Sequence, residues 1–175
     1  SILEAQTKAV TIFGKTWDLH IKDVLKISLE ENLKIIADTV FYLVSKGKTV
    51  IYDCEHFFDG YKSNPEYALK TVLAAQDAGA ARIVFCDTNG GTISSELVRI
   101  IHRVAPKLKA ALGIHAHNDL GLAVANSILA LENGFTHVQG TFNGYGERCG
   151  NADLSTIIGI LKTKLNLDCI PDKNL

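Results

Sequence analysis

Residues 113–119 read Gly-Ile-His-Ala-His-Asn-Asp, after an apolar pair and before a stretch with helical spacing. In a strand, side chains two residues apart lie on the same face, so His115 and His117 point the same way, with Cα atoms about 7 Å apart. Two imidazoles at the end of a strand can bind one divalent cation. A pair of core or surface histidines is the alternative. Because α/β folds place their chemistry at the carboxyl ends of strands, the position favours a metal site.

Around this stretch, the chain repeats a strand, a loop and a helix about five times. Apolar runs predict strands at residues 9–13, 49–54, 82–86, about 111–117 and 136–142. Apolar spacing and caps at Ser28 and Asn64 predict helices at residues 29–47, 65–79, 94–104, about 120–132 and about 151–164. Residues 15–26 and 55–63 are predicted as polar loops. Continuous apolar strands that alternate with amphipathic helices indicate a parallel sheet covered by helices.

The joins between these elements differ from one side of the predicted sheet to the other. Helix-to-strand joins are short and often contain glycine, as at Gly47, Gly79 and Gly134, whereas strand-to-helix joins are longer and carry nearly every polar residue of interest. This one-sided distribution is typical of a TIM barrel. A doubly wound sheet is the rival fold, but no G-x-G-x-x-G follows the first strand and no P-loop occurs.

Length and composition limit the class of protein. A chain of 175 residues predicts one domain over residues 1–175, and shares of 47% apolar and 21% charged residues are those of a globular protein with a real core. A net charge of −1 gives no reason to expect nucleic acid or an anionic membrane as a partner. The four cysteines contain no C-x-x-C pair, which favours free thiols and a cytoplasmic protein. The start without Met predicts a fragment.

Acidic and hydroxyl side chains follow the second and third predicted strands. Glu55 comes where the second strand gives way to its loop, and it is either a solvated loop residue or a group that faces the site. Asp53 shares its strand face by the period of two. Asp87 and Thr88 end the third strand as candidates for substrate binding. For Asp87, the alternative is an Asx-turn that caps the next helix, whereas the Thr88 hydroxyl can bind a carboxylate.

The loop after the last strand is rich in glycine, at residues 140, 144, 146 and 150. Such a loop either turns tightly or brings its backbone close to a ligand. Within it, Glu147 and Arg148 are either site residues or a structural ion pair. Asn151 is either a site residue or simply the N-cap of the last helix.

Three stretches together resemble one enzyme family. They are His-Ala-His-Asn-Asp at 115–119, Asn-Gly-Tyr-Gly-Glu-Arg-Cys-Gly-Asn-Ala at 143–152 and Asp-Thr-Asn-Gly-Gly at 87–91. This combination resembles the 2-isopropylmalate, homocitrate and citramalate synthases, within the superfamily of TIM-barrel metallolyases that includes hydroxymethylglutaryl-CoA lyase. Residues 13–20 and 52–61 look most like the citramalate synthase branch, which joins acetyl-CoA to pyruvate on the way to isoleucine.

The resemblance implies a role for each candidate residue. His115 and His117 would bind the metal, and Asn151 would complete or brace its shell. Thr88 would hold the carboxylate of a 2-oxo acid, and Glu55 would lie against the substrate carbonyl and the acetyl group. Glu147, also a catalytic candidate, would order the last loop with Arg148. The metal would be Mg²⁺, Mn²⁺ or Zn²⁺, the substrates acetyl-CoA and a 2-oxo acid, and the assembly a homodimer.

The resemblance also predicts what the chain lacks. The family's remaining metal ligand is an Asp in an Arg-Asp-Gly signature on the first barrel strand, and no Arg-Asp pair occurs here. We therefore expect barrel strands four to eight, a partial (β/α)8 barrel of about five βα units. The function implied for the complete enzyme is a metal-dependent Claisen-type condensation that yields citramalate. The alternatives are 2-isopropylmalate or homocitrate synthase, or a non-catalytic half-barrel for the isolated piece.

Overall fold

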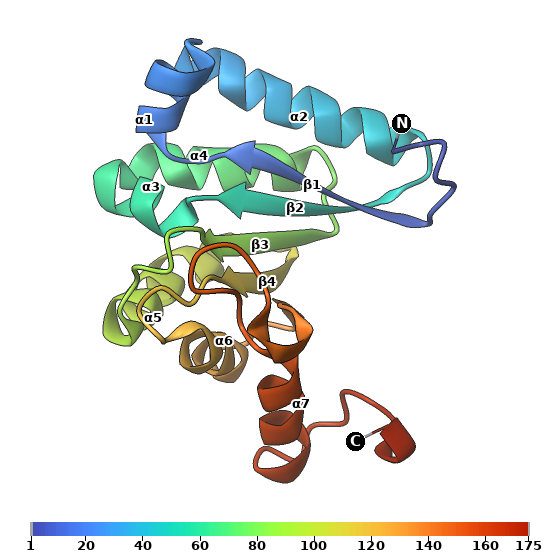
Figure 1. Cartoon of the computed structure of the whole chain (residues 1–175). Helices are drawn as coiled ribbons and strands as arrows, with labels where there is room; N and C mark the ends of the chain where they lie inside the picture. Colours follow the sequence, from blue (N-terminus) through green and yellow to red (C-terminus); the bar gives the residue numbers. More distant parts are fainter. Residues whose placement is uncertain (1, 175) are drawn as a thin grey trace.

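The computed structural model describes residues 2–174, and its elements alternate between strand and helix along the chain (Figure 1). The strands are β1 (Ala9–Lys15), β2 (Thr49–Glu55), β3 (Arg82–Asp87), β4 (Ala111–Ala116) and β5 (His137–Gln139). The α-helices are α1 (Asp18–His20), α2 (Leu29–Ser45), α3 (Phe57–Ser63), α4 (Pro65–Asp77), α5 (Ser94–Val104), α6 (Ala123–Glu132) and α7 (Leu154–Thr163). Shorter helical turns are η1 (Ile21–Leu25), η2 (Ala105–Lys107), η3 (Phe142–Gly144) and η4 (Asp172–Asn174).

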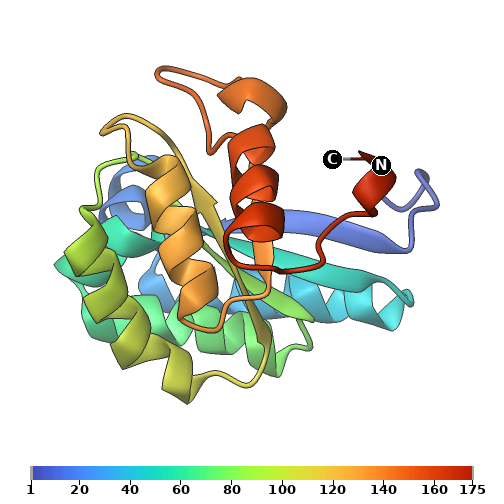
Figure 2. The ribbon, with the colours of Figure 1, turned by 90° about the horizontal axis from the view of Figure 1, so that it is seen from below.

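The five strands form one parallel sheet whose order, β1-β2-β3-β4-β5, is the order of the chain. Because all strands run the same way, their carboxyl ends lie along one edge of the sheet. The sheet is curved, and the helices follow its outer side from α2 to α7 (Figures 1 and 2). The predicted parallel sheet of about five βα units is confirmed.

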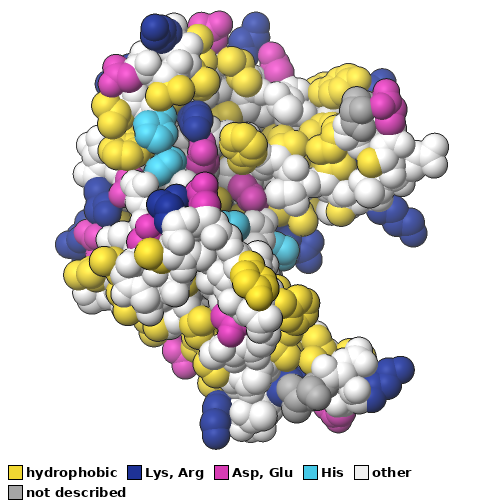
Figure 3. Space-filling model, viewed as in Figure 1, with side chains coloured by type: hydrophobic (Ala, Val, Ile, Leu, Met, Phe, Trp, Pro, Cys, Tyr) yellow, Lys and Arg dark blue, Asp and Glu magenta, His cyan; other side chains and the backbone are white. Residues whose placement is uncertain are grey.

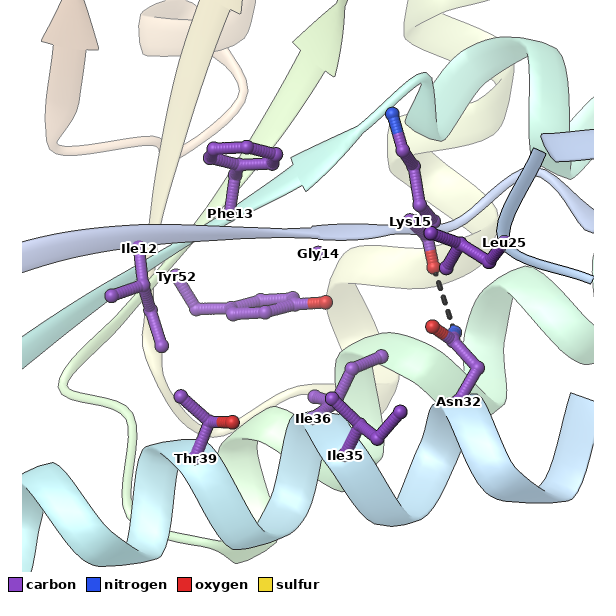
Figure 4. A pocket seen from close by; sticks show the side chains of 10 residues that line it. All are labelled: Ile12, Phe13, Gly14, Lys15, Leu25, Asn32, Ile35, Ile36, Thr39 and Tyr52. Carbon is purple, nitrogen blue, oxygen red and sulfur yellow. Dashed lines mark hydrogen bonds between the residues drawn. The ribbon is translucent and has the colours of Figure 1, made fainter. Parts of the chain in front are cut away.

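The strand pleat separates a covered face from an open one. Val50, Tyr52 and Cys54 of β2 are buried against the helices, whereas Asp53 and Glu55 lie on the opposite, concave face. Beside them on β1, Phe13 and Lys15 point to one side of the strand, and Ile12 and the neighbouring Tyr52 point to the other, toward α2 (Figure 4). Phe13 is 70% exposed, and the molecule has a C-shaped outline around its concave side (Figure 3).

A cavity of about 190 Å³ lies between β1 and α2, on the covered side of the sheet (Figure 4). Its walls include Ile12, Ile36 and Tyr52 and are mainly apolar. None of the residues predicted to bind substrate or metal lines it. The candidate chemistry of the chain therefore lies elsewhere, on the concave face.

Two predicted caps are confirmed in the structure. The Ser28 side chain accepts a hydrogen bond from the Glu31 backbone N–H at 3.0 Å at the start of α2. The Asn64 side chain likewise accepts from the Tyr67 N–H at 3.1 Å, with Pro65 as the first residue of α4. Local side-chain chemistry was sufficient to place both helix starts.

Two segments predicted as polar loops are helical. Residues 18–25 form α1 and the π-helical turn η1, which ends at Lys26 in the left-handed conformation. Residues 57–63 form α3, because Phe57 and Phe58 are fully buried against the helical face of the sheet. A Cβ at Gly60 would lie 2.8 Å from the Thr16 carbonyl oxygen, so the close approach of α3 to the chain after β1 requires glycine.

The carboxyl-terminal boundaries also differ from the prediction. β5 covers only residues 137–139, because the chain beyond it pairs instead through a single bridge between Thr141 and Asp153. α7 begins at Leu154, and its N-cap is Asp153, whose carboxylate accepts from the Ser155 N–H at 3.0 Å. The interpretation of Asn151 as the N-cap of this helix was wrong. Within residues 2–174, no helix is long and apolar enough to cross a membrane.

Candidate active site

The candidate residues gather where the strands end. Lys15, Glu55, Asp87 and Ala116 are the last residues of β1, β2, β3 and β4. Histidine, acidic and basic side chains cluster at this end of the molecule (Figure 3). Parallel strands bring residues distant in sequence to one edge, which is why α/β folds use that edge for chemistry.

The two histidines predicted to bind metal face each other. The Nε2 atoms of His115 and His117 are 3.3 Å apart. Two nitrogens that bind one metal at about 2.1 Å stand about 3.0 to 3.4 Å apart. Burial, followed by the neighbouring His115 and Arg148, lowers the pKa of His117, which favours the neutral imidazole that metal binding requires. The spacing of the pair and the lowered pKa of His117 therefore fit a divalent cation.

A chain of side chains behind His115 orients its ring. Gln139 on β5 donates from Nε2 to Asp53 Oδ1 at 2.8 Å, so its Oε1 is the atom that faces His115 Nδ1, also at 2.8 Å. His115 must then carry its hydrogen on Nδ1 and present the Nε2 lone pair toward His117. Such an outer partner is the usual support of a metal-binding histidine. Burial raises the pKa of Asp53, although the Gln139 hydrogen bond opposes the rise.

Asn151 lies next to His117, with which it forms an antiparallel bridge. Its side-chain Nδ2 donates to the Tyr145 carbonyl at 2.9 Å. Its Oδ1 is buried and has no hydrogen-bond partner among residues 2–174. A buried acceptor without a partner beside a pair of imidazoles is an oxygen atom available to a cation or to a water bound to one. The place of Asn151 in the metal shell stays a prediction, which this unpartnered oxygen fits.

Glu55 is not a solvated loop residue. It is the last residue of β2, and its side chain, 23% exposed, forms an ion pair with Lys15 on the neighbouring strand. Lys15 was not predicted as a site residue, although it lies on the same strand face as Phe13. The carboxylate is thus held on the concave face, as a site residue requires.

Thr88 is joined by a hydrogen bond to the backbone of the residue that follows Glu55. The His56 N–H donates to Thr88 Oγ1 at 2.8 Å, and His56 adopts the left-handed conformation with φ 55°. The Thr88 hydroxyl therefore keeps its own hydrogen to donate to a ligand. The sequence analysis gave His56 no role, because the consequence of a left-handed residue at a strand end cannot be read from its type.

Asp87 is turned away from the concave face. It is 1% exposed, and its two carboxylate oxygens accept from the Thr92 N–H at 3.2 Å and the Thr92 hydroxyl at 2.9 Å. Burial raises the pKa of Asp87, and the Thr92 hydrogen bonds oppose the rise. The structure therefore assigns Asp87 to the brace of the following loop, which corrects its prediction as a substrate-binding residue.

Arg148 fastens the glycine-rich loop to the other strand ends. Its guanidinium donates to both oxygens of Asp119, at 2.8 and 3.1 Å, and to the Thr88 carbonyl at 2.7 Å. Glu147 pairs with the same guanidinium at 2.8 Å, with a side chain that is 66% exposed. Arg148 thus brings the last loop together with Thr88 and with Asp119, which follows His117 by two residues. Glu147 thus contacts the residue that ties this loop to Asp119 and Thr88, and its catalytic role stays a prediction.

A second group of rings, not predicted from the sequence, packs around His56, the residue after Glu55. His20 contacts His56 with ring centroids 4.5 Å apart, and Trp17 lies 5.0 and 5.5 Å from the two rings. Burial, then His56 and Lys15, lowers the pKa of His20. The signal available in the sequence was Trp-Asp-Leu-His at 17–20, but its helical geometry was not predicted.

A family model described as HMGL-like matches residues 2–171. The chain belongs to the HMGL-like family. Enzymes of this family generally depend on a divalent metal. In this HMGL-like chain, no group of three His, Cys, Asp or Glu side chains within residues 2–174 converges as for a metal. The histidine pair and the Asn151 oxygen fit a metal.

Two curated relatives are similar to this chain over nearly all of its length. The HMGL-like chain is 56% identical over its whole length to the (R)-citramalate synthase of Geobacter sulfurreducens, of which it covers 33%. A homocitrate synthase of Sulfurisphaera tokodaii is 38% identical over 95% of the chain, which covers 36% of that protein. The chain thus spans about a third of the length of these relatives. The expected resemblance to the citramalate synthase group is confirmed.

A solved structure supports the fold. The hydroxymethylglutaryl-CoA lyase of Bacillus subtilis superposes with a TM-score of 0.81 at 20% identity, over 91% of this chain and 57% of that one. At this identity the likeness concerns the fold alone. The five βα units are therefore part of an HMGL-like TIM barrel, as predicted.

Proposed function

We propose that the protein carrying this chain condenses acetyl-CoA with pyruvate to form citramalate, in a reaction that depends on a divalent metal. One observation carries the proposal: His115, His117, Thr88 and Glu55 stand at one strand edge in a chain 56% identical to an (R)-citramalate synthase. The product would serve isoleucine biosynthesis. Homocitrate synthases are also relatives, so other 2-oxo acids belong in the assay.

Each residue has a task that its contacts support. A divalent metal held by His115 and His117, when bound, would supply a Lewis acid for the ketone of the 2-oxo acid. Thr88, whose oxygen already accepts from the His56 N–H, donates its own hydrogen to the substrate carboxylate. The Gln139–Asp53 pair keeps His115 in the tautomer that presents Nε2.

Glu55 acts on the acetyl group. A carboxylate fixed on the concave face accepts a proton from the acetyl-CoA methyl. The resulting carbanion forms a carbon–carbon bond with the ketone carbon as the C=O π bond breaks, and the alkoxide oxygen takes up a proton from water. Water then cleaves the thioester and releases free CoA. Arg148 and Glu147 hold the glycine-rich loop over this space through Asp119 and Thr88.

The isolated 175 residues are expected to differ in activity from the longer protein. They span about a third of the relatives' length, and their described part supplies no third charged ligand beside the histidines. A site without its carboxylate binds metal more weakly. We therefore propose that the isolated chain folds as a module without turnover, and that activity belongs to the longer protein.

Release of free CoA tests the function. The full-length gene product is mixed with acetyl-CoA and pyruvate, and in parallel with 2-oxoisovalerate and 2-oxoglutarate, with and without a chelator. We expect CoA release that requires metal and is fastest with pyruvate. His115→Ala and His117→Ala should abolish this release. His102→Ala on the exposed side of α5 is the matched control. Near-wild-type turnover in both histidine variants would show that the metal assignment is wrong.

A further inference from the structure

We propose that Lys15 is a positioning residue, whose ammonium sets the place of the Glu55 carboxylate during the condensation. The inference deepens the proposed function and rests on it. Lys15 and Glu55 are register partners at the ends of β1 and β2, and their side chains form an ion pair. Both point to the concave face, with side-chain exposures of 21% and 23%.

The position of Lys15 is itself set by buried groups. Its carbonyl accepts a hydrogen bond from Asn32 Nδ2 at 3.0 Å (Figure 4). Asn32, 3% exposed on α2, also donates to the Tyr67 hydroxyl of α4 at 2.9 Å. The Thr16 N–H adds a bond to the Glu55 carbonyl at 3.2 Å. The backbone of Lys15 is thus fixed by two helices and a strand pair, and sites on such elements are more precise than sites on loops.

The residue after Glu55 is held by its own contacts. His56, the next residue, is tied through its N–H to Thr88 Oγ1, and its ring packs against His20 and Trp17. These neighbours contribute rings and a backbone amide, and within residues 2–174 the ion pairs of Glu55 involve Lys15 alone. Removal of the ammonium would therefore free the carboxylate to turn, whereas the contacts of His56 would stay.

This arrangement predicts where the loss appears in the kinetics. Lys15 acts through Glu55 and does not touch the 2-oxo acid, so its removal should lower kcat and leave KM for that substrate nearly unchanged. A misplaced catalytic group costs on the order of 10- to 100-fold in turnover. Lys15→Arg keeps a cation at the position and should recover part of the loss.

The experiment is a double-mutant cycle on the full-length gene product. Lys15→Met, Glu55→Gln and the double variant are compared by CoA release, with Lys22→Met as the matched control. The Lys22 side chain is 57% exposed, and its Nζ forms an ion pair with Asp18 Oδ2 at 3.0 Å. We expect Lys15→Met to lower kcat in the wild type but to change it less than about twofold in the Glu55→Gln background. Lys22→Met should keep wild-type turnover.

Several results would overturn the inference. They are full turnover in Lys15→Met, an equal loss in both backgrounds, or a loss confined to KM. If Lys15→Met fails to fold, Lys15→Gln is measured in the same cycle. Crystal structures of the wild type and the variant test the contact without turnover: the Glu55 carboxylate should move only in the variant. If the wild type releases no CoA, the proposed function fails, and a carboxylate that does not move overturns the role of Lys15 separately.

Discussion

At the scale of single residues, substitution of Glu55 separates a catalytic role from a structural one. Its contacts are one ion pair and its backbone, so Glu55→Gln removes a charge and leaves the shape. We expect turnover of the full-length protein to fall on the order of 10²-fold, as for general acid–base groups, with little change in melting temperature. Parallel CoA-release and thermal-melt measurements check this. Intact turnover with a large loss of melting temperature would make Glu55 a structural residue.

The surroundings of His137 predict how the free energy of unfolding depends on pH. Its Nε2 is buried without a partner among the described residues, and burial, followed by Arg82, lowers its pKa below 6.5. Below pH 6.5 the unfolded chain takes up a proton that the folded chain does not, so the free energy of unfolding should fall as pH decreases. Burial lowers the pKa of His20 and His117 in the same way.

Urea unfolding of the full-length protein between pH 5 and 7.5 measures this slope. His137→Gln should flatten it, whereas His102→Gln on exposed α5 should leave it unchanged. A slope that His137→Gln does not alter would contradict the assignment to this residue.

Single residues also show what could be predicted from sequence. The shared direction of His115 and His117 follows from the period of a strand alone, and the structure confirms it. Gln139 was not found, because its bond to Asp53 joins β2 to β5, which are not neighbours in the sheet. Asp87 was a candidate for substrate binding with an Asx-turn as the alternative, and its hydrogen bonds to Thr92 agree with the alternative.

At the scale of elements, the loops after β3 and β4 touch through Gly90. Gly90 has φ +59°, and a Cβ there would stand 2.7 Å from the Asp119 backbone nitrogen and 2.9 Å from the His117 carbonyl carbon. Gly90→Ala should therefore push the two loops apart. We expect a loss of melting temperature and, in the full-length protein, of turnover, because Asp119 holds Arg148.

Gly91→Ala is the matched control for this loop. The nearest atom to a Cβ at Gly91 is the Asn89 carbonyl oxygen, 4.0 Å away. Its melting temperature and turnover should stay near those of the wild type. Equal effects of the two substitutions would show that the loop, and not the contact at Gly90, is sensitive.

Elements were predicted well where local chemistry decided them. The caps at Ser28 and Asn64 are local, and α2 and α4 begin where expected. Helix α3 was missed because burial of Phe57 and Phe58 against the sheet decides it. β5 is shorter than its apolar run because the chain after Gln139 bends toward Asp153.

At the scale of the whole molecule, the concave face and the two edge strands are open. β1 and β5 each have a single strand neighbour, and Phe13 is 70% exposed on the concave side. Unpaired strand edges beside exposed apolar surface favour pairing with another chain. We therefore expect the isolated 175 residues to self-associate, as measured by size-exclusion chromatography with light scattering.

Phe13→Lys should reduce this association. Ile93→Lys is the control, since Ile93 is 54% exposed just before α5, away from the concave face. A stable monomer of the isolated chain with citramalate synthase activity would refute both the association and the inactive-module proposal. The predicted homodimer of the full-length protein stays a prediction, which the same method tests.

The agreement between strand order and chain order also bears on how the protein is made. During synthesis, each new strand emerges beside a neighbour that is already complete, so the sheet can grow in one direction without waiting for distant segments. The bond from Gln139 to Asp53 spans 86 residues and forms only when β5 has left the ribosome. His115 is therefore oriented only after the fifth strand has been made. A product that stops before β5 would have well-paired strands but an unoriented histidine pair.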